Sequence, residues 1–293
     1  MIAFVLTLTL AATAPAKGAP TKKGQPAAQP AAPPAAQPEP SPEEAAAEDT
    51  AVQPLDPDTL AFLSSSGATN SMDGSVRLDW QGPGGNQLKL SWDSLDKRNE
   101  EVQTAEMLRV SLVGAVQSFY DGDGTIDVPG MRQKLKSLLI GPVDEARTAY
   151  LNAIKLEERR LFFVERGMAE AAAAKEELPG VDGRLVSKRL TALRDGRIAA
   201  EMQKRVNGYR SLAVGLLAYL DGDTFGALNN VREAAGGLPD VAVVHALLGS
   251  LYALYGQTDA AVVSWKKSLE LDPTNKAVRE AILQHSPKTR QVR

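Results

Sequence analysis

A period of 34 residues near the C-terminus constrains the fold more than any other feature of the chain. Six positions recur at this spacing: Gly215 and Gly249, Gly222 and Gly256, Ala227 and Ala261, Val231 and Trp265, Ala234 and Ser268, Pro239 and Pro273. Such a period is typical of arrays whose units bury their apolar faces against one another. The residue types suit paired helices, because small residues allow close contact, a glycine ends the first helix and a proline ends the unit.

The two units resemble the tetratricopeptide repeat, over about residues 207–275. The second copy carries most of the family's pattern, in Leu248, Gly249, Tyr252, Gly256, Ala261, Trp265 and Pro273. In the first copy Ala218 stands where a large aromatic side chain is usual, so that copy is more degenerate. The resemblance implies that residues 207–293 form a short α-solenoid of two repeats, followed by a capping helix and a tail.

The resemblance also implies a concave surface built from the first helix of each repeat. This candidate partner-binding surface consists of Tyr209, Leu212, Leu216, Tyr219, Val243, Ala246, Ser250, Ala253 and Leu254. Family members that clamp a peptide carboxylate carry Lys, Arg and Asn at several of these places, so an apolar helix or peptide is the expected ligand here. Alternatively, the chain's own helices fill the groove, because two repeats are fewer than a stable solenoid usually needs.

Residues 94–206 are expected to form a helical domain upstream of the repeats. The first predicted helix, residues 95–120, carries an apolar stripe of Met107, Val110, Val113, Val116 and Tyr120. A long helix over residues 142–178, which Gly167 could interrupt, is followed by a turn and a return helix that extends to Val206. Two long amphipathic helices with a short turn between them predict an antiparallel hairpin.

Residues 58–93 are expected to hold a small β-hairpin. Val76, Leu78 and Trp80 alternate with polar residues, and Leu88, Leu90 and Trp92 repeat the alternation after a Gly/Pro-rich segment. Two runs of period two around such a turn predict paired strands. An isolated hairpin is only marginally stable, so we expect it to pack on the helices.

The first 57 residues predict export and a spacer. Residues 1–16 resemble a secretory signal peptide, with an apolar run from Ile2 to Ala12 and small residues after it, although no Lys or Arg precedes the run. Ten of the chain's 18 prolines lie between Lys17 and Pro57, in a segment with little apolar surface to bury. We expect residues 17–57 to be a disordered linker.

Few catalytic chemistries fit the composition. The chain has no cysteine, which excludes thiol chemistry, and only two histidines, which argues against a zinc site with several histidine ligands. The segment that contains Asp121 and Asp123 resembles the first motif of haloacid-dehalogenase-like phosphatases, which use such a pair with Mg²⁺. That motif requires a preceding buried strand, but here the pattern predicts a helix. The same segment matches part of a calcium-binding loop, but Gly130 occupies the place of the bidentate Glu.

The sequence thus predicts an all-α protein: a helical hairpin domain followed by a tetratricopeptide-like α-solenoid, with a small N-terminal β-hairpin. The net charge of −3 with mixed signs gives no indication of nucleic-acid binding. We expect a non-catalytic adaptor or scaffold without cofactor or metal, which binds other proteins in the periplasm or at the envelope of a bacterium. The alternatives are a Mg²⁺-dependent phosphatase that uses Asp121 and Asp123, and a purely structural subunit whose groove is filled by its own helices.

Overall fold

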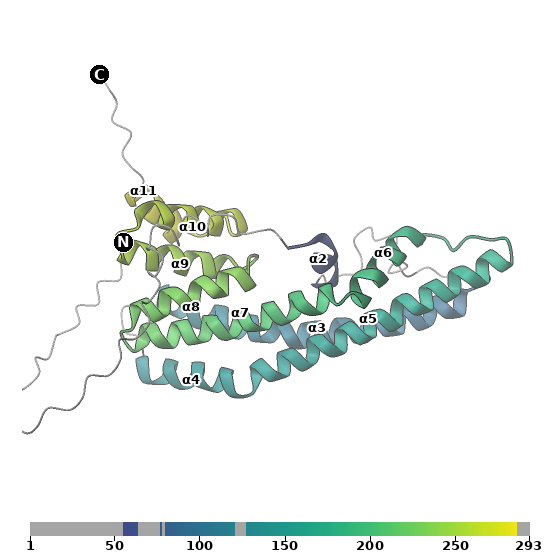
Figure 1. The fold of residues 1–293 in the computed structure, drawn as a ribbon, viewed down its shortest axis with the longest axis horizontal. Coiled ribbons are helices and arrows are strands. Elements are labelled where there is room, and N and C mark those ends of the chain that lie inside the picture. The colour runs from purple at the N-terminus through teal and green to yellow at the C-terminus, as the bar shows by residue number, and fades with distance from the viewer. Residues whose placement is uncertain (1–54, 64–76, 78–79, 121–126, 286–293) are drawn as a thin grey trace, which may run out of the picture. The chain divides into compact units, whose positions relative to one another are not determined.

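The computed structural model describes residues 55–63, 77, 80–120 and 127–285, and these residues are all-α, with no β-strand among them (Figure 1). The predicted all-α class is confirmed. The predicted signal peptide and nearly all of the predicted linker lie outside the described residues. The helices are α2 (Pro57–Leu63), α3 (Gly85–Tyr120), α4 (Val128–Ile140), α5 (Pro142–Ala173), α6 (Gly183–Arg194), α7 (Arg197–Leu220), α8 (Thr224–Gly237), α9 (Ala242–Leu254), α10 (Thr258–Leu271) and α11 (Lys276–His285).

The longest helices, α3 and α5, lie side by side (Figure 1). Glu106 accepts a hydrogen bond from Tyr150, whereas Gln87, which precedes Glu106 on α3, donates to Glu170 near the other end of α5. The earlier residue of α3 contacts the later residue of α5, so the two helices are antiparallel. The helix expected over residues 142–178 is amphipathic, as predicted, and one of its faces is buried, including Val143, Ala146, Ala149, Tyr150, Ala153, Leu161 and Val164, with Ile154 half-buried.

The predicted β-hairpin is wrong in its second strand. Residues 88–92 lie in the first turns of α3, and Leu90, which was expected to share a face with Leu88, is exposed. Leu88, Ser91 and Leu95 are buried instead, at the i, i+3, i+7 spacing of one helical face. A short apolar run fits the strand period of two and the helical period of 3.6 equally well. The neighbouring helix α5 provides a surface against which the helical face can pack. Most of the first predicted strand lies outside the described residues.

The apolar stripe predicted on residues 95–120 is wrong in its first half. Met107 and Val110 are 61% and 62% exposed, whereas Val116 is buried. Residues spaced by three drift about 60° around a helix at each step, so a run of such steps cannot stay on one face. The buried apolar residues of α3 are Leu88, Leu95, Val102, Ala105, Leu108, Leu112, Ala115 and Val116.

The predicted hairpin partner of α5 also differs. The main partner is α3, and the expected return helix is two helices, α6 and α7, which separate at Gly196. Gly196 has a φ of +73°, a left-handed conformation that glycine adopts without strain. The boundary expected between residues 206 and 207 lies inside α7, and the described residues all belong to one compact unit, residues 52–293.

Gly167 does not interrupt α5. It is buried where the loop before α3 crosses the helix, and a Cβ added to Gly84 would lie 2.4 Å from the carbonyl oxygen of Gly167. The two backbones approach so closely that a side chain has little room at either position, which explains why both residues are glycine. Gly84 also has a φ of +83°.

A second contact between α3 and α5 consists of buried charges and also holds α2. Glu157 accepts two hydrogen bonds from Arg160, of 2.7 and 2.8 Å, and lies 3.3 Å from Arg98. Glu157 thus lies between two buried guanidinium groups. Arg98 directs its Nη2 at the carbonyl oxygens of Ala61 and Phe62, at the C-terminal end of α2, where a helix carries partial negative charge.

The helices α7 to α10 form two pairs whose contacts repeat at the 34-residue spacing. A Cβ added to Gly215 would meet the carbonyl of Ala227 at 3.3 Å and Val231 at 2.9 Å; one added to Gly249 would meet the carbonyl of Ala261 at 2.9 Å and Trp265 at 2.5 Å. The turns match too. Gly222 and Gly256 have φ of +84° and +71°, and both follow the ends of first helices.

The end of the second pair is closed by α11. Val278 on this helix is buried, and the ring of His285 lies 5.2 Å from that of Trp265. Trp265 is 3% exposed and its Nε1 donates to the carbonyl of Ala246 on α9. The indole therefore fixes α9, α10 and α11 to one another.

Replacing Trp265 by Ala should lower the free energy of unfolding by about 3–5 kcal/mol, because it leaves a cavity between three helices. Urea denaturation monitored by circular dichroism measures this. Val263→Ala, at a position 45% exposed on the same helix, is the control and should cost less than about 0.5 kcal/mol. A cost for Trp265→Ala below about 1 kcal/mol would contradict the packing described here.

Candidate functional site

The predicted partner-binding surface is divided between buried and accessible residues. Tyr209, Leu212, Leu216 and Ala246 are each 1% exposed and belong to the core. Tyr219, Val243, Ser250 and Ala253 are half-buried, and Leu254 is 47% exposed. In the first repeat the expected surface is therefore mostly interior, whereas in the second repeat it is partly accessible.

Helices from the first half of the chain pack against α7. Both α3 and α4 pack against α7, and α3 also reaches α9. At the end of α7, Arg132 of α4 donates to the carbonyl of Leu220 at 3.1 Å and lies 2.5 Å from a carboxylate oxygen of Asp221. Tyr209, Leu212 and Leu216 are therefore buried within the chain and are not accessible to a partner in this structure.

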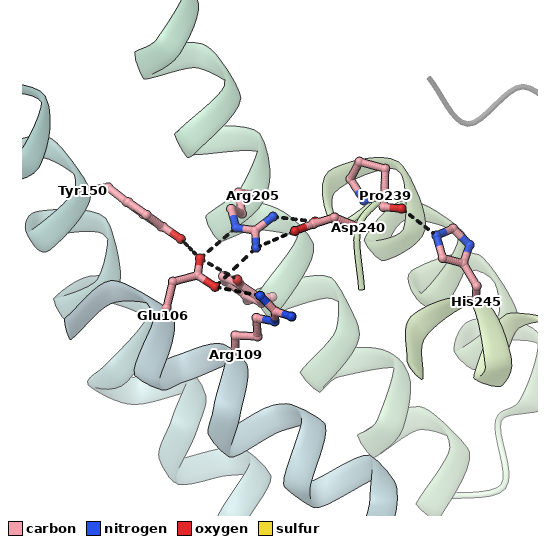
Figure 2. A network of polar contacts seen from close by, with 8 residues as sticks. Glu106, Arg109, Tyr150, Arg205, Pro239, Asp240 and His245 are labelled. Atoms are coloured by element: carbon pink, nitrogen blue, oxygen red, sulfur yellow. Dashed lines mark hydrogen bonds and ion pairs between the residues drawn. The ribbon is translucent and has the colours of Figure 1, made fainter. Parts of the chain in front are cut away.

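The centre of this covered face is a polar network around Glu106 of α3 (Figure 2). Its carboxylate accepts hydrogen bonds from Tyr150 of α5 and from Tyr209 of α7, the latter at 3.2 Å. Arg205, also on α7, donates to both carboxylate oxygens at 2.9 and 3.3 Å. Three helices thus meet at one carboxylate.

Arg205 extends the network to the second helix pair. Its guanidinium, which is 2% exposed, donates to both oxygens of Asp240 at 2.7 and 3.1 Å. Asp240 lies in the turn between α8 and α9 (Figure 2). Paired donation to a carboxylate is the strongest form of this contact, because guanidinium and carboxylate are both planar and charged. Arg205 therefore joins α3 to the junction between the two repeats.

The electrostatics of the network keep its charges fixed. Burial alone would raise the pKa of the Glu106 carboxyl, but Arg205, Tyr150 and Arg109 outweigh burial, and the pKa is lowered from its ordinary 4.5. Burial and the neighbouring Tyr209 and Glu106 raise the pKa of the Tyr150 hydroxyl. Glu106 and Arg205 are therefore charged and the tyrosine neutral near neutral pH, which suits a structural clamp.

His245 lies next to this network at the start of α9 and is buried (Figure 2). Its Nε2 is 3.2 Å from the carbonyl oxygen of Pro239, which can only accept, so Nε2 carries a proton. Burial lowers the pKa of the imidazole, and the hydrogen bond to Pro239 offsets this only in part. The ring is therefore neutral near pH 7 and acts as a packing residue with one hydrogen bond.

Sequence reasoning did not identify the network. Glu106, Arg205 and Asp240 come from three segments up to 134 positions apart, and each has the character of an ordinary surface charge. Only Tyr209 was assigned to a site, on the expectation that it faced a partner. One signal was available in the sequence. Arg205 stands at a position where the helical spacing of Met202, Val206 and Tyr209 predicts a buried side chain.

The acidic segment with Asp121 and Asp123 lies outside the described residues. It follows α3 directly and precedes α4, so the strand that the phosphatase motif requires is absent from the described residues on its N-terminal side. Gly130 has a local structural role: its N–H donates to Oδ1 of Asp127 at 3.0 Å, which caps α4. Within the part of the chain that the structure describes, no three acidic or histidine residues gather as a metal site would require.

Comparison with known proteins identifies no relative: no family model, curated protein or solved structure matches the chain. None of the helices among the described residues combines the length and apolar character that a membrane span needs.

Replacing Glu106 by Gln should cost about 3 kcal/mol of stability at pH 7, because Arg205 loses a charged partner in the interior. Because folding lowers the pKa of Glu106, its contribution is present above pH 4.5 and is lost as the pH falls through the folded-state value. The difference in stability between wild type and variant should therefore narrow below pH 4.5.

Urea denaturation at a series of pH values tests this. Glu101→Gln on the same helix, where the carboxylate accepts only a 3.3 Å bond from Asn152 among the bonds described, is the control and should cost less than about 1 kcal/mol. A difference for Glu106→Gln that stays constant down to pH 3 (roughly one and a half pH units below the ordinary carboxyl pKa) would show that folding does not lower the pKa of Glu106.

The double substitution Leu212→Glu with Leu216→Glu should unfold the first repeat, since it places two carboxylates in the core between α7 and its covering helices. A loss above about 4 kcal/mol is expected. Circular dichroism and thermal melting measure it, with Leu254→Glu, at an exposed position, as the control. A double variant that melts like wild type would show that this face is open.

Proposed function

We propose that the protein is a non-catalytic adaptor or scaffold that binds another protein through its C-terminal helix pairs, which are tetratricopeptide-like repeats. The observation that carries the proposal is the recurrence of the same contacts 34 residues apart, in the glycine crossings at Gly215 and Gly249 and in the turns at Gly222 and Gly256. Stacked helix pairs of this kind present an extended surface whose usual task is to bind peptides or helices.

The partner-binding surface is proposed on α9 and no longer on α7. Val243, Ser250, Ala253 and Leu254 are the members of the predicted surface that remain accessible there. The successive spacings from Val243 to Leu254 are seven, three and one residues, which place the four side chains on one side of the helix. The small side chains of Ser250 and Ala253 allow a partner backbone to approach, and Leu254 offers apolar contact, so an amphipathic helix or an extended apolar peptide is the proposed ligand.

Export to the periplasm or the bacterial envelope is part of the same proposal. It rests on the apolar run from Ile2 to Ala12 and on the Pro-rich segment after it, which suits a spacer between an envelope structure and a binding domain. Possible assemblies include copies of the chain itself as well as other proteins.

A second candidate is a purely structural subunit. One observation favours it: α3 and α4 pack against α7, and Leu212 and Leu216 of α7 are buried, as they would be in a chain whose repeats serve only its own fold. The two candidates differ in whether α9 contacts another molecule.

Site-specific photocrosslinking distinguishes them. A photoreactive amino acid is placed at Ser250 or Leu254, and as control at Leu151 on α5, which is 49% exposed against 47% for Leu254. We expect a discrete adduct in envelope extract from Ser250 and Leu254, and an adduct from Leu151 that is weaker by about fivefold or more. Leu254→Glu should weaken the adduct formed from Ser250 by about tenfold, since it places a charge in an apolar contact.

No adduct from either α9 position, or equal adducts from all three positions, would contradict binding through α9. An adduct of two copies of the chain that forms with the purified protein alone would identify the self-assembling structural subunit instead.

A further inference from the structure

A cavity of about 640 Å³ lies where the loop before α3 crosses α5, far along the sequence from the repeats. Its lining includes two of the three tryptophans of the chain, Trp80 and Trp92, both half-buried. The volume falls in the range of small-molecule sites, which combine aromatic walls with a few directed polar groups. The remaining tryptophan, Trp265, belongs to the core of the second repeat.

The loop holds Trp80 in a fixed position. The indole Nε1 donates to the carbonyl of Pro83 at 3.2 Å. A Cβ added to Gly82 would lie 2.3 Å from Cζ2 of the same ring, and one added to Gly85 would lie 2.5 Å from the Trp80 carbonyl oxygen. Because the N–H is bonded within the loop, the part of Trp80 that faces the cavity acts as an apolar wall. Because this side chain is already ordered in the free protein, binding a ligand costs less side-chain entropy.

The rest of the lining balances donors and acceptors. Lys89 and Arg77 contribute positive charge, and Asp93 and Glu170 contribute negative charge. Glu170 is held in place by a 3.0 Å bond from Gln87, and Arg77 pairs with Asp96. The side-chain amides of Gln81 and Asn86 add groups that both donate and accept.

This balance selects among ligand classes. A phosphorylated or acidic ligand would meet two carboxylates, and a cation would meet a lysine and an arginine, so neither gains from the field of the site. A neutral polyhydroxyl compound gains from every one of these groups, because each hydroxyl donates and accepts. The flat, apolar faces of two indoles match the C–H face of a pyranose ring.

From this geometry we infer that the cavity binds a neutral oligosaccharide, with a sugar ring against Trp80 and Trp92 and its hydroxyls bonded to Asp93, Lys89 and the amides. The site goes beyond the proposed adaptor function and shares no residue with α9. A protein with both sites would join a protein partner to a glycan.

Tryptophan fluorescence of the full chain tests the inference. Trp265→Phe removes the core fluorophore, so that the signal comes from Trp80 and Trp92. The probes are cellotetraose, maltotetraose, xylotetraose and the β-1,4-linked tetramer of N-acetylglucosamine. We expect at least one to shift or quench the emission in a saturable manner.

Two variants locate the binding. Trp92→Ala should weaken the affinity by about tenfold or more through loss of stacking. Trp92 also contacts the core, so its loss can affect the fold, and Asp93→Ala is therefore the second variant. Asp93 is exposed, and the loss of its charged acceptor should weaken binding by about tenfold without affecting the fold. Glu165→Ala, an exposed carboxylate that does not line the cavity, is the matched control and should bind like the parent.

No saturable change with any of the four sugars up to about 10 mM, a limit that corresponds to very weak binding, would overturn the inference. So would binding that Trp92→Ala and Asp93→Ala leave unchanged. Binding of a proline-rich decapeptide that depends on Trp92, without binding of any sugar, would assign the cavity to polyproline recognition instead. Each of these results is independent of photocrosslinking from Leu254, which Trp92→Ala should leave intact.

Discussion

The arrangement of the described helices depends on one buried guanidinium. Arg205 lies between the carboxylates of Glu106 and Asp240, which belong to α3 and to the turn between α8 and α9. A buried cation without partners is very unfavourable, whereas two well-oriented carboxylates compensate for much of its desolvation. Any shift of α3 along α7 would separate these groups, so the network specifies one relative position of the long helices and the repeats.

That position has a consequence for function. Glu106 on α3 contacts Arg205 and Tyr209 on α7, α4 packs on α7 as well, and Leu212 and Leu216 are core residues. Two helix pairs alone have too little contact to be stable as a solenoid. Here α3 and α4 pack on the first pair and α11 packs on the second, whereas Val243, Ser250, Ala253 and Leu254 of α9 stay at least partly accessible.

The long helix α3 links the separate features of the molecule. Its N-terminal turn borders the cavity with Trp80 and Trp92, its middle carries Arg98 and Glu106, and its C-terminal half packs on α5 and α7. Charged groups at the two internal contacts, Arg98 with Glu157 and Glu106 with Arg205, fix the register of α3 against both neighbours. Apolar surface alone would define that register less sharply, since one leucine can replace another in a neighbouring position.

The sequence by itself determined the helical class and the details of the C-terminal pairs. Gly222 and Gly256 at the turns, and Gly215 and Gly249 at the crossings, follow from local needs: a positive φ, or space for a second backbone. Such requirements act within a few residues or within one hairpin and leave a mark at a fixed period. The inward face of α5 was also predictable, because many apolar residues recur there at helical spacing.

Only the tertiary structure decided which faces are covered. Leu88 and Leu90 fit a strand as well as a helix until α5 supplies a partner. In the sequence, Leu212 and Leu216 look like part of an open groove, but the fold buries both. The same holds for Glu106, Arg205 and Asp240, whose charges suggest exposure. Burial and pairing depend on segments far away in the chain, and no local pattern of residue types encodes the contacts between them.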